Sequence, residues 1–201
     1  MRIETLEKLF LEELADIRSA EQQTLKALPK MVKAANDAEL KESLEEHRRV
    51  TEEHLERLDR IFELMGQRPA AKKCKGMAGL LDEAQEVLKK EMDPALMDAA
   101  IIAAAQRVEH YEMAVYGTLR SFADQLGSGE VARLLERTLD EEKEADLQLT
   151  EIAHSVVNPQ AAEEEEGDDE ARAAADEDED EDEEEEEDED VELEEVEELE
   201  R

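Results

Sequence analysis

Apolar residues recur along the first 160 residues at steps of three and four, and no stretch alternates between apolar and polar positions. Positions three, four and seven apart share one face of an α-helix. The pattern therefore predicts an all-α protein with four long amphipathic helices, at about residues 4–35, 36–66, 93–127 and 130–159.

Residues typical of helix ends mark these boundaries. Asn36, with Glu39 three residues later, is a capping signal for the start of the second helix. Asp93 followed by Pro94 marks the start of the third helix in the same way. Gly66 and Gly127 are expected where the second and third helices end.

The lengths of the connections predict the topology. Helices one and two, and helices three and four, are joined by only a few residues, so each pair is expected to be antiparallel. The connection between helices two and three spans residues 66–93 and contains a short helical pattern near 77–90. A crossover of that length lets the third helix restart at the opposite end of the bundle. The predicted fold is a ferritin-like four-helix bundle with a long crossover that contains a short helix.

Polar residues interrupt the apolar stripe of every helix near its middle. They are Glu21 in the first helix, His47, Thr51 and His54 in the second, Glu109 and Glu112 in the third, and Glu142 and Asp146 in the fourth. Because all of them lie close to the midpoints of their helices, we expect them to meet in one layer of the core.

Five carboxylates and two imidazoles in one buried layer predict a metal site. Ionised carboxylates repel one another strongly at low dielectric. Two divalent cations would offset the five negative charges, and oxygen-rich ligands with one or two imidazoles suit iron or manganese. A hydrogen-bonded polar layer without metal is the alternative.

The ligand pattern differs from the usual carboxylate-bridged site, which has Glu-x-x-His on each of two helices. The second helix reads His47-x-x-x-Thr51-x-x-His54 instead. The single Glu-x-x-His match, Glu151 and His154, lies off the apolar stripe and is interpreted as chance. His110 also points away from the stripe, which indicates a surface or interface position.

Charge separates a body from a tail. The 201 residues include 61 acidic and 24 basic residues, a net charge of −37. Residues 163–201 carry 28 acidic and two basic residues, including fifteen consecutive carboxylates at 176–190. Such a segment repels itself and buries nothing. We therefore predict a bundle domain over residues 1–160 and a disordered acidic tail over 161–201.

Composition excludes several classes of protein. Cys74 is the one cysteine, so internal disulfides are excluded. No apolar run reaches the ~18 residues of a membrane span, and an acidic chain lacks the cationic surface that nucleic acid requires. We therefore expect a cytoplasmic protein that binds neither membrane nor nucleic acid directly.

Two side-chain types leave alternatives open. Cys74 lies between Lys73 and Lys75, whose charge could lower the thiol pKa, but an inert cysteine in a basic loop is the favoured interpretation. Tyr111 and Tyr116 lie near Glu112 and could carry electrons to a metal, although packing in the core or an interface is favoured.

Several short motifs resemble the YciE/YciF-like ferritin-like proteins. They are Ala20-Glu21-x-Gln23, Ala27-Leu28-Pro29-Lys30-Met31, His47-x-x-x-Thr51, Gly76-Met77-x-Gly79-Leu80, Val108-Glu109-His110-Tyr111-Glu112 and Thr138-Leu139-x-Glu141-Glu142. The resemblance covers about residues 5–155. It implies a small bacterial stress-associated protein, often dimeric, with a ferritin-like bundle and a poorly defined activity. The chain departs from the family pattern at Arg18 and Val50, where relatives often carry Tyr and Glu.

Two functions remain open from the sequence. The first is a dinuclear iron or manganese protein of the stress response, acting as a ferroxidase or consuming peroxide. The second is a non-catalytic bundle whose acidic tail binds basic partners or keeps the protein soluble in salt. In either case we expect a homodimer. No catalytic residue is indicated, and the expected metal ligands are Glu21, His47, His54, Glu109, Glu112, Glu142 and Asp146.

Overall fold

The computed structural model describes residues 3–163 and contains only helices in that range. They are α1 (Leu6–Ala34), α2 (Ala38–Leu64), α3 (Lys75–Val87), α4 (Pro94–Gln125), α5 (Gly129–Ile152) and a π-helical turn, η1 (Ala153–Val157). No helix within these residues is long and apolar enough to cross a membrane. The predicted acidic tail over 161–201 lies almost wholly outside the described residues and stays a prediction.

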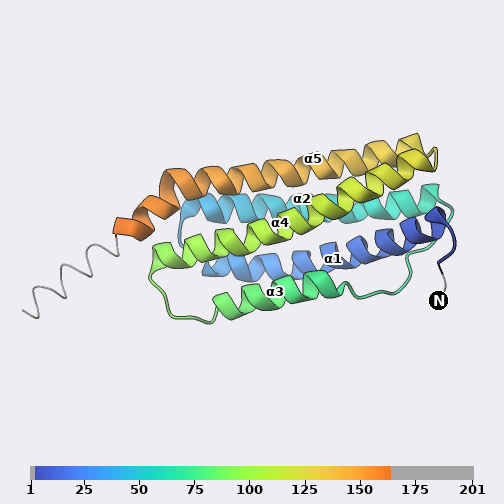
Figure 1. Ribbon diagram of the computed structural model, residues 1–201. Coiled ribbons are helices and arrows are strands. Elements are labelled where there is room, and N and C mark those ends of the chain that lie inside the picture. Colours follow the sequence, from blue (N-terminus) through green and yellow to red (C-terminus); the bar gives the residue numbers. More distant parts are fainter. Residues whose placement is uncertain (1–2, 164–201) are drawn as a thin grey trace, which may run out of the picture. The chain divides into compact units, whose positions relative to one another are not determined.

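Helices α1 and α2 form one antiparallel hairpin, and α4 and α5 form another (Figure 1). Across the bundle α1 packs against α4 and α2 packs against α5. The crossover from α2 to α4 includes α3, which lies against α1 and α4 as the chain returns along the bundle (Figure 1). The predicted ferritin-like four-helix bundle with a helix in its crossover is therefore confirmed.

The start of α2 differs by one residue from the sequence prediction. Asp37, rather than Asn36, is the N-cap residue, and its carboxylate accepts a hydrogen bond of 2.8 Å from the backbone N–H of Leu40. The backbone N–H groups of Asn36 and Asp37 both donate to the buried carboxylate of Asp98 on α4, at 2.7 Å. This carboxylate ties the α1–α2 turn to the neighbouring helix.

The predicted ends of α2 and α4 are confirmed. Gly66 and Gly127 follow these helices with φ angles of 64° and 71°. A side chain at such an angle is strained, so glycine is the favoured residue there.

The apolar core is divided into two clusters by a polar layer. One cluster includes Phe10, Leu14, Leu58, Tyr116 and Leu135, and the other includes Leu28, Leu40, Ile101, Leu149 and Val157. Each of the four long helices contributes to both clusters. The middle turns of these helices lie between the clusters.

The π-helical turn changes which residue faces the core at the end of α5. The regular helical pattern places Val156 on the inner face, but Val157 is fully buried and Val156 is only half-buried. A π-turn contains more residues than an α-turn, which shifts the inward position by one residue.

Candidate metal centre

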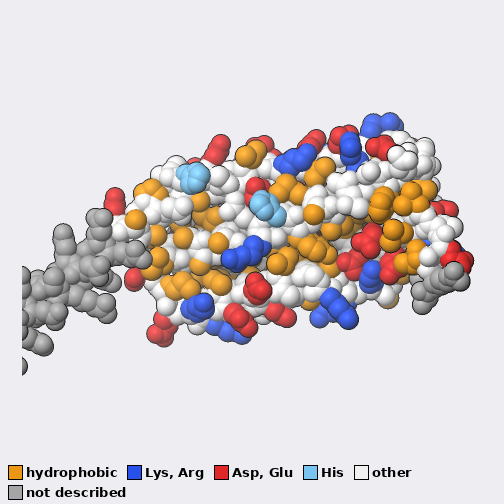
Figure 2. All heavy atoms as spheres, in the orientation of Figure 1, with side chains coloured by type: hydrophobic (Ala, Val, Ile, Leu, Met, Phe, Trp, Pro, Cys, Tyr) orange, Lys and Arg blue, Asp and Glu red, His pale blue; other side chains and the backbone are white. Residues whose placement is uncertain are grey.

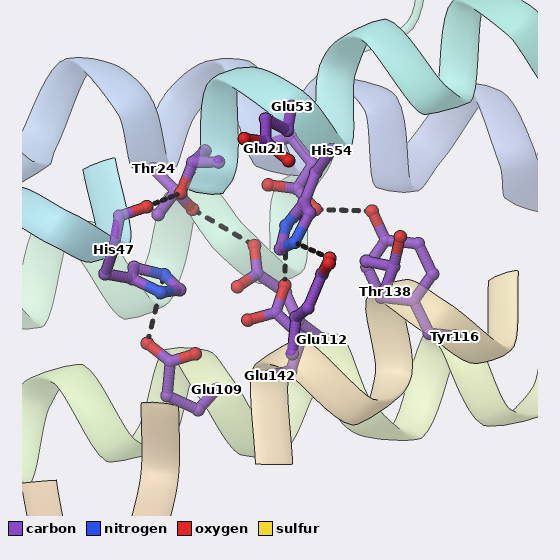
Figure 3. Close-up of polar contacts among 12 residues, drawn as sticks. Glu21, Thr24, His47, Glu53, His54, Glu109, Glu112, Tyr116, Thr138 and Glu142 are labelled. Atoms are coloured by element: carbon purple, nitrogen blue, oxygen red, sulfur yellow. Dashed lines mark hydrogen bonds and ion pairs between the residues drawn. The ribbon is translucent and has the colours of Figure 1, made fainter. Parts of the chain in front are cut away.

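Six of the seven residues expected to bind metal converge in the polar layer. They are Glu21 from α1, His47 and His54 from α2, Glu109 and Glu112 from α4, and Glu142 from α5. All six are buried, and Figure 3 shows His47 and His54 pointing from α2 towards the carboxylates of Glu109 and Glu142.

These residues form two groups of potential ligands. His47, Glu109, Glu112 and Glu142 make up one group, and Glu21, His54 and Glu142 make up the other. Within each group the ligand atoms all lie within 4.8 Å of one another. Glu142 belongs to both groups, so its carboxylate lies between two potential metal positions.

The two imidazoles of the layer lie close to carboxylates. Nε2 of His47 lies 3.4 Å from Oε1 of Glu109. Nδ1 of His54 lies 3.1 Å from Oε1 of Glu142 and 3.5 Å from Oε1 of Glu21. Both imidazoles therefore direct a ring nitrogen at carboxylate oxygens in the same layer.

Many polar atoms of this layer have no hydrogen-bond partner among the described residues. They are Oε2 of Glu21, Nε2 of His47, Nδ1 of His54, Oε2 of Glu109, Oε2 of Glu112 and both carboxylate oxygens of Glu142. Leaving one buried polar group unsatisfied costs about 1–3 kcal/mol, and more when it is charged. Every buried side-chain nitrogen or oxygen that lacks a hydrogen-bond partner in residues 3–163 belongs to one of the two ligand groups. The donor set is therefore suited to bound cations.

A second set of side chains orients His54. Its Nε2 lies 3.1 Å from Oε2 of Glu141, and Glu141 also accepts hydrogen bonds of 2.6 Å from Arg57 and 2.8 Å from Arg137. An imidazole that donates one N–H to a carboxylate presents its other nitrogen to a metal, a common arrangement in metal sites. Here that other nitrogen is Nδ1, which faces Glu21 and Glu142.

Two hydroxyl groups hold carboxylates of the layer. The buried Tyr116 donates to Oε1 of Glu21, and Thr24 donates to Oε1 of Glu112 at 3.2 Å. Tyr116 also packs in the apolar core, as the sequence analysis favoured. In both cases one oxygen of the carboxylate is paired while Oε2 stays without a partner among the described residues.

Without metal, the surroundings of two acids of the layer favour their neutral forms. Burial and the neighbouring carboxylates of Glu142 and Glu112 raise the pKa of Glu109 well above its ordinary value. Burial, with the charges of Glu21 and Glu142, does the same to the pKa of Glu112. Burial lowers the pKa of His47 and so favours the neutral imidazole that binds metal.

His54 and Glu142 behave in the opposite way. Burial acts to lower the pKa of His54, but its contacts with Glu141, Glu142 and Glu21 outweigh burial and raise the pKa to about 12. Burial acts to raise the pKa of Glu142, but the contact with His54 and the nearby His47 hold it below its ordinary value. In the metal-free protein this proton on His54 neutralises part of the charge that a cation would otherwise offset.

Asp146 does not join the layer. It is half-buried, accepts a hydrogen bond of 3.1 Å from Gln106 and lies 3.3 Å from Nε2 of the exposed His110. It follows Glu142 by about 6 Å along the axis of α5. The expected surface position of His110 is confirmed, and Glu151 and His154 are also exposed, as predicted.

The sequence analysis missed Glu141 and Arg57. The local signals were the position of Glu141 next to Glu142 and of Arg57 three residues after His54. Arg57 is 8 % exposed, and a buried arginine is costly unless an acidic side chain pairs with it.

Known proteins share this fold and much of this sequence. The YciF protein of Escherichia coli (strain K12) is 41% identical over 162 residues, which is 80% of this chain and 98% of that protein. The crystal structure of this E. coli stress protein matches with a TM-score of 0.76, over 78% of this chain and 99% of the other.

Two further solved structures match the chain. YcfI from Rhodopseudomonas palustris, provisionally described as a structural protein, is 44% identical with a TM-score of 0.72, over 74% of this chain and 94% of the other. A protein from Xanthomonas campestris pv. campestris has the same fold at 23% identity, with a TM-score of 0.62 over 80% of this chain and 99% of the other. Residues 5–162 match the profile of the family described as a domain of unknown function, DUF892. The chain therefore belongs to the DUF892 family, and the E. coli stress protein YciF is one of its relatives.

Proposed function

We propose that the chain binds two divalent transition-metal ions in its polar layer and uses them in a stress response. The observation that carries this proposal is the set of seven buried polar atoms, from four helices, without hydrogen-bond partners among the described residues. Two cations placed within the two ligand groups would give each of these atoms a partner.

The charges support a pair of ions. Glu21, Glu109, Glu112 and Glu142 supply four negative charges when ionised, and two divalent cations supply four positive charges. Glu141 is already neutralised by Arg57 and Arg137, so it is not counted with the ligands. Burying a balanced set of charges costs far less than burying uncompensated carboxylates.

The donor types favour iron or manganese. Each ligand group contains one imidazole and two or three carboxylates and has no thiolate. Either metal, when bound, would supply redox chemistry towards dioxygen or peroxide. Within the protein His54 is held by Glu141, Glu21 is held by Tyr116, and the apolar clusters on both sides limit access of water.

The relatives of the chain suggest the biological role of the proposed metal pair. Similarity to a stress protein supports a role in a stress response. Oxidative or osmotic stress, with oxidation of ferrous iron or consumption of peroxide at the metal pair, is our proposal for that role. A cytoplasmic location, a homodimer and basic partners for the acidic tail are part of the same proposal. The alternative is a bundle without catalytic activity, in which the pairing of Glu141 with both His54 and Arg57 would stabilise the polar layer without a metal.

Metal analysis tests the proposal directly. We expect full-length protein without a tag, loaded with Fe²⁺ or Mn²⁺ and desalted, to retain close to two ions per chain by mass spectrometry. Glu112→Gln or Glu142→Gln should lose most of this metal, because each replaces a buried ligand. Glu151→Gln, an exposed position on the same helix as Glu142, is the matched control and should retain it. Wild-type protein that retains no transition metal would support the non-catalytic alternative.

A further inference from the structure

A groove on the surface between α2 and α5 leads to the proposed metal centre. It consists of two adjoining hollows of about 200 and 380 Å³. Residues Ser43, Glu46 and Gln148 line both hollows, so the two lie side by side. The smaller hollow is also lined by His47, which belongs to one of the two ligand groups.

The walls of this groove are strongly acidic. Its lining residues include six carboxylates, Glu39, Glu42, Glu46, Glu141, Glu144 and Glu151. Glu141 is neutralised by Arg57 and Arg137, so the negative charge of the groove comes mainly from the others. Among the lining residues of the two hollows, Arg49 is the one with a full positive charge, and it pairs with Glu46. By contrast, apolar, basic and acidic side chains are mixed on the face shown in Figure 2, which lies over α3, α4 and α5.

His47 connects the groove with the buried layer. It is 7 % exposed, whereas the other five members of the ligand groups are at most 2 % exposed. Its Nε2 has no hydrogen-bond partner among the described residues and faces Oε1 of Glu109 at 3.4 Å. The wall of the groove therefore contains a nearly buried metal-binding side chain with an unused donor atom.

We propose that the α2–α5 groove is the access route for divalent cations, with His47 as the first ligand that an incoming ion meets. The proposal rests on the metal-binding function proposed above. A cleft lined by one sign of charge focuses the electric field and raises the local concentration of the opposite ion, which increases association rates by about 10- to 1,000-fold. Carboxylates along the groove would supply this field, and His47 would pass the ion to Glu109, Glu112 and Glu142.

The rate of metal loading tests the route. Metal-free full-length protein is mixed with Co²⁺ in a stopped-flow instrument, and the visible absorption of the bound ion is followed at low and high salt. The double variant Glu42→Lys/Glu144→Lys changes two exposed groove residues that belong to neither ligand group. We expect it to load at least about tenfold more slowly at low salt, with a smaller salt dependence and the same final amount of bound Co²⁺.

A matched control separates the groove from net charge. Asp82→Lys/Glu83→Lys makes the same change in charge at exposed positions on α3, which packs against α1 and α4 rather than α2 and α5. This control should load at nearly the wild-type rate. Equal rates in the two double variants would overturn the proposed route while leaving the metal site in place. Wild-type protein that binds no Co²⁺ at equilibrium would overturn the metal-binding function and the route together.

Discussion

Glu141 shows how a residue outside the ligand set can control the centre. It contacts Nε2 of His54, while Arg57 and Arg137 hold its carboxylate in place. Burial acts to raise the pKa of Glu141, but His54 and these two arginines outweigh burial and hold the pKa well below its ordinary value. Glu141 is therefore ionised at neutral pH and fixes the ring orientation in which Nδ1 of His54 faces the layer.

We expect Glu141→Gln to weaken metal binding by about 10- to 100-fold, the usual effect of losing a carboxylate that orients a ligating histidine. The final number of ions at saturation should stay the same, because every ligand remains. Affinity is measured by competition with a chelator of known strength. Asp140→Asn is the control and should leave affinity unchanged, because Asp140 is an exposed neighbour that pairs with Lys143 and not with His54 or the arginines within residues 3–163. A reduced number of sites in Glu141→Gln would instead identify Glu141 as a ligand.

Cys74 is a structural residue rather than an activated thiol. It is fully buried, its Sγ lies 3.0 Å from the hydroxyl of Tyr111, and it accepts the backbone N–H of Met77 at 3.4 Å as the N-cap of α3. Burial raises its thiol pKa, and Asp16 adds to the rise. The possible lowering of this pKa by the adjacent lysines is therefore not found.

Slow thiol chemistry is the expected consequence at Cys74. Because the thiolate is the reactive form, we expect the native protein to react with a thiol reagent at neutral pH far more slowly than the same protein in denaturant. Absorbance of the released chromophore measures both rates on one sample, so the denatured chain serves as the control. Similar rates in the two conditions would contradict the buried position of Cys74.

At the scale of elements, helical periodicity was sufficient to predict α1, α2, α4 and α5 and the level at which their polar residues meet. An apolar stripe fixes which face of a helix is inside, so six positions of the polar layer could be inferred from spacing alone. Asp146 fitted the same spacing, but the packing of α4 against α5 places it beside Gln106 and His110. The contact between Glu141 and His54 joins two helices, and single-helix periodicity contains no information about such a pairing.

The hydrogen bonds from the α1–α2 turn to Asp98 on α4 should contribute to the stability of the bundle. Asp98 is 3 % exposed and accepts two backbone N–H groups, and its removal would leave both donors without this partner. We expect Asp98→Ala to lower the free energy of unfolding by roughly 2–4 kcal/mol, the cost of two lost charge-assisted hydrogen bonds. Urea denaturation of metal-free protein measures this change. Asp93→Ala should cost much less, because the Asp93 side chain makes no capping hydrogen bond; equal losses would show that Asp98 has no special role.

At the scale of the whole molecule, the polar layer makes the stability of the metal-free protein depend on pH. The raised pKa values of Glu109 and Glu112 stabilise the fold fully below pH 4.5, and this contribution is lost as pH rises through their folded-state values. The contribution of His54 is complete below pH 6.5 and is lost as pH rises towards about 12. The lowered pKa values of Glu142 and His47 affect the stability of the fold only below pH 4.5 and pH 6.5, the ordinary pKa values of the two groups. Above pH 6.5, the shifted groups of this layer that still titrate are those with raised pKa values. Their loss of protons lowers the stability of the fold as pH rises.

The melting temperature of metal-free protein should therefore fall by several degrees between about pH 6.5 and about pH 8.5. One proton held differently by the folded and unfolded chains changes stability by about 1.4 kcal/mol per pH unit, and each kcal/mol moves the melting temperature by about 2–4 °C for a protein of this size. Saturating Mn²⁺ should abolish most of the fall, because the metal replaces the protons on Glu109 and Glu112 and binds more tightly as those protons leave. Circular dichroism melts of chelator-treated protein, with and without Mn²⁺, measure both curves. Glu109→Gln should make the metal-free curve less steep, because the amide cannot ionise, while His54 still contributes to the fall. A metal-free melting temperature that stays constant over this range would show that the layer does not hold these protons. It would also contradict the argument that cations replace them.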